Sequence, residues 1–225
     1  SPNPAQPRRG LLRLSAADAD AEPTLALTTS SILSKVEGPF AEVSALRTMR
    51  WIATDCISSN LSNDWEEAPA ISDGLALLQY TSGTTTTPRG VMVSHRNLIH
   101  NSTSISRAFE ITPDTVSVTW LPAFHDMGLT NGIIQPLLNG RQCYLMPPQS
   151  FPQRPLRWLQ AISHYRASIS GGPNFAYELC ARRITPEQCG RLDLSRWTAA
   201  YNGAEPIRAE TLKLFSAAFA PYGFQ

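Results

Sequence analysis

The chain has 225 residues, of which 42% are hydrophobic and 16% charged, and its 19 Lys and Arg against 18 Asp and Glu leave a net charge of +1. This near-neutral balance argues against a basic nucleic-acid-binding protein and against an acidic disordered tail. The length predicts one large domain or two small ones, with enough chain to bury a hydrophobic core.

Residues 1–23 are rich in Pro, Ala, Asp and Arg, and we expect them to form a linker or a partial segment with a short helix over 11–18. Residues 24–225 are expected to form the folded part. Apolar patterning there predicts a strand over 25–28 and a helix over 34–46. The polar, acidic stretch 56–73 predicts a surface loop.

Strands and helices alternate more clearly in the second half of the chain. The apolar run Leu75–Tyr80 is typical of a buried strand. Further strands are predicted over 116–121, 143–146, 167–170 and 198–201. Helices are predicted over 95–109 with Ser94 as cap, over 155–165 with Pro155 at the first position, over 175–183 with Asn174 as cap, and over 208–219 with Leu212, Phe215 and Phe219 on one stripe. This alternation predicts an α/β domain with a largely parallel sheet.

A hydroxyl-rich segment directly follows the 75–80 strand. Six of the seven residues from 81 to 87 are Ser or Thr, two glycines bracket the segment, and Arg89 lies near its end. Hydroxyl groups, free backbone N–H groups and a guanidinium are the donors that phosphate oxygens require. The segment therefore indicates phosphate binding, although it is not a Walker loop and its composition alone also fits a Thr-rich surface connection.

Three more polar or glycine-rich segments follow predicted strands, which is where α/β sheets place their ligands. Each also has a structural interpretation. His125 could be held by Asp126, the Gly171-Gly172 segment could be a strand–helix turn capped by Asn174, and the segment after Asn202 could be a tight turn.

The ordered motifs resemble those of the fatty acyl-AMP ligases, members of the adenylate-forming ligase superfamily. The hydroxyl-rich segment, Tyr80-Thr81-Ser82-Gly83-Thr84-Thr85-Thr86-Thr87-Pro88-Arg89-Gly90, resembles their phosphate-binding loop. The other matching motifs are Gly90–His95, Trp120–Pro122, Phe124–Leu129, Arg154–Leu159, Gly171–Tyr177 and Asn202–Pro206. The resemblance extends from about Leu25 to Gln225, which implies part of the large N-terminal domain of such a ligase.

The resemblance implies activation of a fatty acid by ATP to an acyl-adenylate, followed by transfer to the phosphopantetheine of an acyl carrier protein. It assigns the phosphates to Thr81, Ser82, Gly83, Thr84, Thr85, Thr86, Thr87, Arg89 and Gly90. It assigns adenine to Asn202, Gly203, Ala204 and Glu205. It assigns the acyl and carboxylate site to His125, Asp126, Met127, Gly171, Gly172, Pro173 and Asn174, with His125 and Arg89 nearest the chemistry.

The sequence departs from the family pattern at two positions of the loop. Arg89 stands where Lys is usual, and Thr86 stands where Gly or Ser is common. Arginine keeps the charge but not the compact ammonium geometry, and a β-branched residue stiffens the loop. Neither change abolishes phosphate binding on physical grounds, but both affect the expected rate.

Several expectations concern partners and the rest of the protein. The Mg²⁺ ligand, the ribose Asp and the C-terminal domain with its catalytic Lys are expected beyond Gln225, so we expect this chain to be an incomplete fragment. An acyl-CoA ligase and a non-catalytic nucleotide-binding remnant remain as alternatives. No nucleic-acid partner and no membrane span are expected, and no residue is singled out as a metal ligand. Four cysteines with no Cys-x-x-Cys pattern favour a reducing cytoplasm, with Cys180 as a small core residue.

Overall fold

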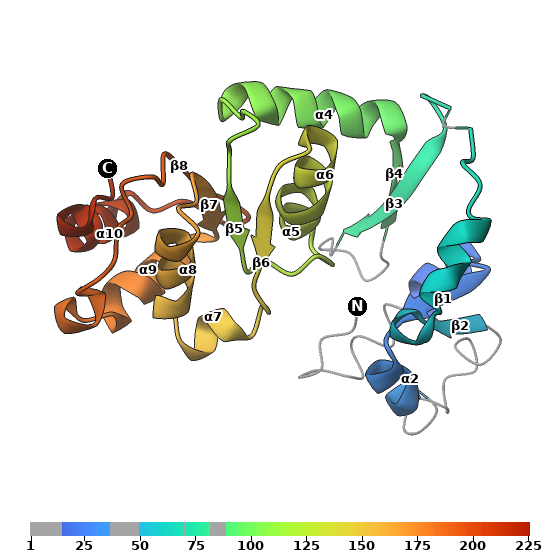
Figure 1. Cartoon of the computed structure of the whole chain (residues 1–225), viewed down its shortest axis with the longest axis horizontal. Helices are drawn as coiled ribbons and strands as arrows, with labels where there is room; N and C mark the ends of the chain where they lie inside the picture. The colour runs from blue at the N-terminus through green and yellow to red at the C-terminus, as the bar shows by residue number, and fades with distance from the viewer. Residues whose placement is uncertain (1–14, 37–49, 70, 82–88) are drawn as a thin grey trace. The chain divides into compact units, whose positions relative to one another are not determined.

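The computed structural model describes residues 15–36, 50–69, 71–81 and 89–225 (Figure 1). The chain divides into two compact units, Ser1–Asn97 and Leu98–Gln225, and each is considered by itself. None of the described helices has the length and apolar character needed to cross a membrane.

The first unit contains two short two-stranded sheets. Its elements are a helix over 15–21, β1 (Leu25–Thr28), α2 (Ser30–Val36), β2 (Arg50–Ala53), the 3-10 helices η1 (Thr54–Cys56) and η2 (Ser59–Asp64), β3 (Leu75–Thr81) and β4 (Arg89–Ser94). Strands β1 and β2 pair in parallel, and β3 and β4 pair antiparallel. The strand predicted over 25–28 is confirmed, and the stretch predicted as a loop over 56–73 includes η2 but stays largely exposed.

Both helices predicted in the first unit have different bounds in the structure. The predicted helix over 34–46 begins earlier, at Ser30, and its portion from 37 on lies outside the described residues. The Asp55 carboxylate accepts the Ser30 N–H at 2.8 Å and the Ser30 hydroxyl at 2.6 Å, which fixes the start of α2 from a distant part of the chain. For the helix predicted over 11–18, residues 11–14 lie outside the described residues, and the described part is helical over 15–21, three residues further than predicted.

Strand β3 forms where the apolar run predicted a strand, but it is not a buried parallel strand. Its neighbour among the described residues is β4, which the sequence analysis did not predict. Leu75 is half-exposed and the rest of β3 up to Tyr80 is partly buried. The pairing runs to Thr81 opposite Arg89, so the two strands converge on both ends of the hydroxyl-rich segment.

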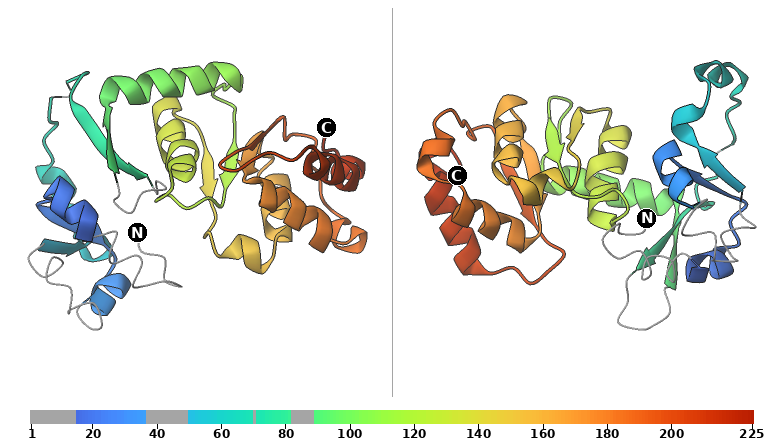
Figure 2. Two further views of the ribbon diagram at one scale, coloured as in Figure 1. Left: turned by 180° about the vertical axis from the view of Figure 1, so that it is seen from behind. Right: turned by 90° about the horizontal axis from the view of Figure 1, so that it is seen from below.

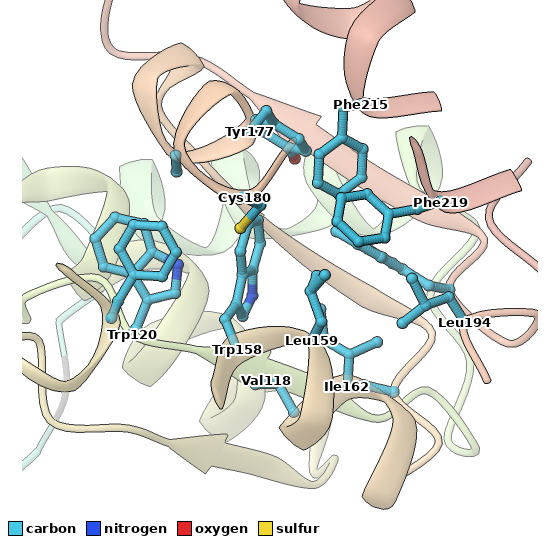
Figure 3. Packing of buried hydrophobic residues seen from close by; sticks show 14 of the residues in the cluster. Val118, Trp120, Trp158, Leu159, Ile162, Tyr177, Cys180, Leu194, Phe215 and Phe219 are labelled. Atoms are coloured by element: carbon cyan, nitrogen blue, oxygen red, sulfur yellow. The ribbon is translucent and has the colours of Figure 1, made fainter. Parts of the chain in front are cut away.

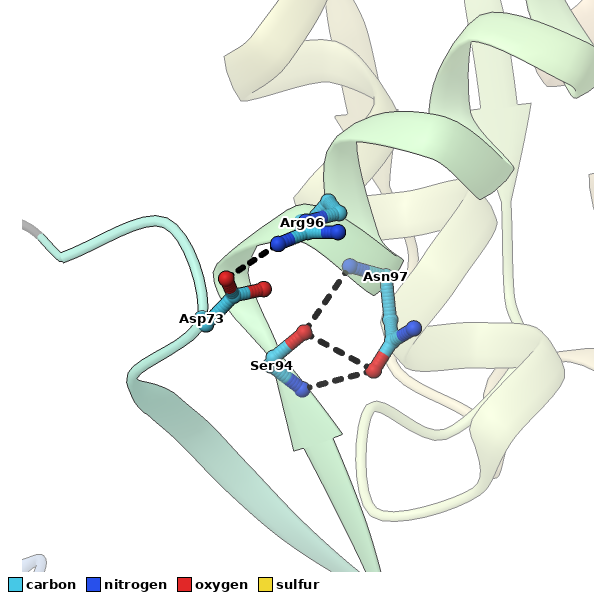
Figure 4. Close-up of polar contacts among 4 residues, drawn as sticks. All are labelled: Asp73, Ser94, Arg96 and Asn97. Carbon is cyan, nitrogen blue, oxygen red and sulfur yellow. Dashed lines mark hydrogen bonds and ion pairs between the residues drawn. The ribbon is translucent and has the colours of Figure 1, made fainter.

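Helix α4 (His95–Ala108) begins with a reciprocal capping arrangement (Figure 4). The Ser94 hydroxyl accepts the Asn97 N–H at 3.2 Å, and Asn97 Oδ1 accepts the Ser94 N–H at 3.0 Å. Two of the backbone donors at the helix start are thereby satisfied. Arg96 also pairs with Asp73 at the surface. Ser94 is therefore confirmed as the cap that the sequence predicted.

A Ser94→Ala variant is expected to lose about 1 kcal/mol of stability, because the Asn97 N–H loses its acceptor. Chemical denaturation of the two proteins measures this loss. Ser104→Ala in the same helix is the control, since its exposed hydroxyl bonds only the His100 carbonyl within the helix and its removal is expected to be nearly neutral. Equal losses in both variants would contradict the capping role.

The second unit holds a four-stranded parallel sheet in the order β6-β5-β7-β8. The α/β fold class with a parallel sheet is thus confirmed. Its elements are β5 (Ser117–Thr119), α5 (Asp126–Leu129), the π-helical turn η3 (Thr130–Ile134), α6 (Gln135–Asn139), β6 (Cys143–Leu145), α7 (Ser150–Gln153), α8 (Leu156–His164), β7 (Ile169–Gly172), α9 (Asn174–Arg183), η4 (Pro186–Cys189), β8 (Ala199–Asn202), α10 (Ala209–Phe219) and η5 (Ala220–Tyr222).

Helices cover both faces of this sheet (Figure 2). Successive strand side chains point to opposite faces, so Val118 and Trp120 lie on one side and Thr119 on the other. The first two belong to the main hydrophobic cluster with α8, α9 and α10. The Thr119 methyl group lies 3.0 Å from where a Cβ on Gly132 of η3 would stand.

The main core is aromatic and lies between the sheet and α7–α10 (Figure 3). Its fully or almost fully buried members include Val118, Phe151, Trp158, Leu159, Ile162, Tyr177, Cys180, Leu194, Phe215 and Phe219. Cys180 is therefore a core residue, as predicted. The inward stripe predicted for the last helix is partly wrong: Leu212 is 40% exposed, and Thr211 is buried in line with Phe215 and Phe219 instead.

Candidate functional site

A pocket of about 460 Å³ opens in the second unit. This volume lies within the range of small-molecule sites. The pocket joins the end of α4, the segment from residue 125 to 131 and the loop after β8, and its lining residues are Ile105, His125, Asp126, Met127, Thr130, Asn131 and Ala204. Two segments that lie far apart in the sequence, each singled out as a candidate ligand segment, therefore form one site.

Gly203 and Met127 mark the place where these two segments meet. A Cβ placed on Gly203 would stand 3.4 Å from the Met127 methyl group, an ordinary van der Waals distance. Ala204, the next residue, lines the pocket and adopts φ +68°, a left-handed conformation that costs a non-glycine residue about 1–2 kcal/mol. Strained backbone of this kind persists where the surrounding structure holds it, and here it faces the pocket.

His125 and Asp126 are held together at the pocket wall. His125 Nδ1 lies 2.6 Å from Asp126 Oδ1, and the same oxygen accepts the Met127 N–H at 2.6 Å. His125 Nδ1 also accepts the Met127 N–H at 3.4 Å, so both side chains contact the start of α5 and Nδ1 is occupied by contacts within the protein. The contact with Asp126 matches the structural interpretation of His125, while its position in the pocket wall also fits a ligand role.

The segment after His125 forms a continuous helical stretch through α5, η3 and α6. The sequence analysis missed it, and with it the pocket residues Thr130 and Asn131, because Gly128, Gly132 and Pro136 disfavour a helix locally. Gly128 is required there by close packing: a Cβ on it would stand 2.1 Å from the Pro122 carbonyl oxygen. The contribution of Ile105 to the pocket was missed as well.

Asn174 does not cap its helix, contrary to the prediction. It is the first residue of α9, is buried, and gives no side-chain cap to the helix. The Phe175 N–H instead donates a hydrogen bond to the Glu205 carboxylate at 2.7 Å. A carboxylate at a helix N-terminus is also favoured by the helix dipole. Glu205, predicted to lie near adenine, therefore has a structural partner in α9.

The Asn174 side chain holds the loop that follows β8. Its Oδ1 accepts the Arg208 N–H at 3.1 Å, and Asn202 Nδ2 lies 3.5 Å from the same oxygen. Its Nδ2 donates to the Thr211 hydroxyl at 3.1 Å. One buried amide thus contacts the start of the loop, its end and the helix beyond it.

Gly171 and Gly172 belong to strand β7, so the predicted strand over 167–170 begins and ends later than expected. Both are buried, and the space beside each is filled. A Cβ on Gly171 would stand 2.1 Å from the Tyr201 carbonyl oxygen, and one on Gly172 would stand 2.9 Å from the Trp120 ring. The residues that line the pocket do not include these glycines, Pro173 or Asn174.

Two polar features flank the start of the segment that was predicted to bind adenine. The Asn202 Oδ1 atom is buried and has no hydrogen-bond partner among the described residues. The Tyr177 hydroxyl donates to the Tyr201 carbonyl at 2.6 Å, and burial raises the pKa of Tyr177, so this hydroxyl keeps its proton. The backbone entering the segment is therefore fixed, while an acceptor on Asn202 remains free.

The hydroxyl-rich segment that was predicted to bind phosphate belongs to the first unit. Ser82, Gly83 and the four threonines 84–87 lie outside the described residues, and so does residue 88. The strand residues Thr81 and Arg89 face one another at the end of the hairpin. Gly90 lies opposite Tyr80, whose ring would be 3.0 Å from a Cβ at this position, so Gly90 serves close packing in β4.

The described residues offer no cluster of three or more His, Cys, Asp or Glu side chains that could hold a metal ion.

A model of the AMP-binding enzyme family matches residues 2–224. The chain is 49% identical over 225 residues to the medium-chain-fatty-acid–[acyl-carrier-protein] ligase JamA of Moorena producens, covering 100% of this chain and 38% of that protein. It is 38% identical over 215 residues to the long-chain-fatty-acid–AMP ligase FadD26 of Mycobacterium marinum, covering 93% of this chain and 37% of that protein.

The fold is also similar to solved structures. A fatty acyl-adenylate ligase from L. pneumophila, crystallised with acyl adenylate and pyrophosphate, superposes with a TM-score of 0.88 at 41% identity, covering 96% of this chain and 37% of that one. The chain spans less than two fifths of the length of these relatives.

Proposed function

Because the chain belongs to the AMP-binding enzyme family, we propose that it is part of a ligase that activates a fatty acid with ATP. In this reaction a carboxylate oxygen forms a bond to the α-phosphorus, and the bond from that phosphorus to pyrophosphate breaks. The products are an acyl-adenylate and pyrophosphate. Residues 24–225 are proposed as part of the AMP-binding domain, with 1–23 as a linker or partial segment.

The observation that carries the proposal is the pocket that joins residues 125–127 to the loop after β8. An acyl-adenylate requires adenine and the reacting carboxylate at neighbouring positions, and these two segments are the ones proposed to hold them. Gly203 and Ala204 have no large side chains that would keep the base away from the backbone, and Ala204 lines the pocket. The free Asn202 Oδ1 could accept a hydrogen bond from the exocyclic amine of adenine, which would satisfy a buried acceptor.

We propose that His125 shapes the carboxylate site and does not act as a base. A fatty-acid carboxylate is already ionised near neutral pH, so no proton needs to be removed before attack. The contact with Asp126 fixes the orientation of the imidazole, and Nε2 is the atom left to contact the ligand. The Met127 methyl group lies beside Gly203, and we propose that it separates the acyl chain from the base.

The phosphates are proposed to bind the segment between β3 and β4, with Thr81 and Arg89 at its two ends. Catalysis would then rest mainly on positioning and on neutralising charge at the phosphates. The acyl group is proposed to pass next to a carrier-protein phosphopantetheine. This is supported by the relatives JamA and TtuA, which are both named as acyl-carrier-protein ligases.

Fatty-acid-dependent exchange of labelled pyrophosphate into ATP tests the proposal in the longest natural form of the protein. Exchange is expected with the parent and is expected to fall at least tenfold in Arg89→Ala, because a charge-assisted contact to phosphate is worth about 1.5–3 kcal/mol. Arg157→Ala, on the exposed face of α8, is the matched control and is expected to retain exchange.

The same assay separates the alternatives. Adding CoA or a phosphopantetheinylated carrier protein to the acyl-adenylate decides the acceptor. A folded full-length protein that shows no exchange with any fatty acid would contradict the ligase proposal and leave a non-catalytic nucleotide-binding protein.

A further inference from the structure

Thr211 is a buried polar residue of the second unit that does not line the pocket described above. It lies in the first turn of α10, is 5% exposed, and its hydroxyl accepts a hydrogen bond from Asn174. Thr211 lies in line with Phe215 and Phe219 on an otherwise apolar stripe. Burying its hydroxyl costs free energy, and a valine of the same shape would avoid that cost. In the structure, the hydrogen bond with Asn174 accounts for a threonine at this position.

The Asn174 amide connects Thr211 to the loop proposed to hold adenine. Because Nδ2 donates to Thr211, Oδ1 is turned toward the Arg208 N–H at the end of that loop. The same Oδ1 lies within reach of Asn202 at its beginning. Both ends of the loop therefore contact the same buried side chain, that of Asn174.

The loop has few other fixed points. Glu205 holds its middle to the start of α9 through the Phe175 N–H. Ala204, directly before it, is in the strained left-handed conformation and lines the pocket. A strained backbone keeps its conformation only while its anchors hold. The anchors at Asn174 therefore decide where Ala204 and the Asn202 acceptor lie.

We propose that Thr211 is a positioning residue for nucleotide binding, which acts through Asn174 to fix the loop from Asn202 to Arg208. This inference rests on the proposed function, since it assumes that this loop holds adenine. Loss of the Thr211 hydroxyl leaves Asn174 Nδ2 buried without an acceptor. The amide then turns to find a new partner and releases the Arg208 N–H, which loosens the loop on the side facing the pocket.

Thr211→Val tests the proposal, because valine keeps the shape and removes the acceptor. In pyrophosphate exchange by the longest natural form of the protein, we expect the KM for ATP to rise about tenfold, the size of one buried hydrogen bond lost from a binding loop. The KM for pyrophosphate is expected to stay within twofold, because pyrophosphate does not carry the base. Thr211→Ser, which restores the hydroxyl, is expected to return the KM for ATP to within twofold of the parent value.

Two further variants complete the design. Ser216→Ala, at an exposed position of the same helix, is expected to leave both KM values unchanged. Thr211→Ala removes the hydroxyl together with the γ-methyl group, and it replaces Thr211→Val if the latter does not fold. ATP binding measured by calorimetry accompanies the kinetics.

The outcomes separate this inference from the function on which it rests. Parent protein that binds no ATP would contradict both. Parent protein that binds ATP, with an unchanged KM for ATP in the folded hydroxyl-free variant, would overturn the positioning role alone. A fall in melting temperature with equal changes in both KM values would also overturn it, because that is the result expected of a purely structural threonine.

Discussion

Replacing Gly128 with alanine is expected to lower pyrophosphate exchange about 100-fold. The new Cβ would stand 2.1 Å from the Pro122 carbonyl oxygen, 2.7 Å from its carbon and 3.0 Å from the Leu121 carbonyl carbon. All three atoms belong to the backbone, so no side chain can rotate away. Either α5 or the preceding turn must move by about an ångström, and both carry the residues that form the pocket wall. Displacements of this size cost about 100-fold in rate in well-ordered active sites.

Gly190→Ala is the matched control for this substitution. Gly190 lies at φ −50°, and the nearest atom to a Cβ there is the Glu187 carbonyl oxygen at 3.8 Å. This change is expected to leave exchange intact and to be neutral or slightly stabilising. Exchange rates and melting temperatures of the two variants provide the comparison. Full exchange by Gly128→Ala would show that the 125–131 segment does not form the working site.

Replacing Trp158 with alanine is expected to destabilise the protein by about 3–5 kcal/mol. Trp158 is completely buried and packs edge-on against Trp120, Tyr177 and Trp197, at ring-centre distances of 6.2, 5.6 and 5.4 Å (Figure 3). Its indole N–H also donates to the Ser170 hydroxyl at 2.8 Å. Since whole domains are stable by only about 5–15 kcal/mol, this loss removes a large share of the total. Denaturant titration of parent and variant measures it.

Trp65→Ala serves as the control for the core substitution. The Trp65 side chain is 72% exposed, so its removal is expected to change stability by no more than about 0.5 kcal/mol. A similar loss in both tryptophan variants would mean that the aromatic cluster is not the core on which the second unit depends.

The parallel strands of the second unit were predictable because each is a short apolar run between turn residues. The structure trims these strands: β5 keeps Ser117–Thr119 of the range 116–121, and β6 keeps Cys143–Leu145 of the range 143–146. Strand β7 shifts toward Gly172, because Gly171 and Gly172 pair with β8. Local composition locates a strand, whereas its ends depend on the neighbouring strand.

The errors have a common physical origin in contacts between distant residues. Asn174 has the local features of a cap, but it is the carboxylate of Glu205, a residue that follows β8 in the chain, that accepts the Phe175 N–H at the start of α9. The helical stretch after His125 contains residues that disfavour helices, yet Gly128 is the residue that fits against the Pro122 carbonyl. Thr211 was overlooked because a single threonine in an apolar stripe gives no signal until its partner is known.

The candidate site was predictable in part. His125, Asp126, Met127 and Ala204 were selected from motifs, and the structure brings them to one pocket. The assignments of Gly171, Gly172, Pro173 and Asn174 to the acyl site, and of residues 81–90 to the phosphates, stay predictions. The motifs select candidate ligand segments, but they do not distinguish a residue that would touch a ligand from one that supports the segment.

The strand order β6-β5-β7-β8 has a consequence for how the protein acquires its binding capacity during folding. Residues 125–127 follow β5, an interior strand, whereas Ala204 follows β8, the edge strand that pairs only with β7 among the described residues. The pocket therefore forms only after the last strand has joined the sheet, through contacts between segments distant in sequence that form slowly. A nucleotide that binds there would recognise only molecules in which β8 has joined the sheet, and it would shift the folding equilibrium toward them by mass action.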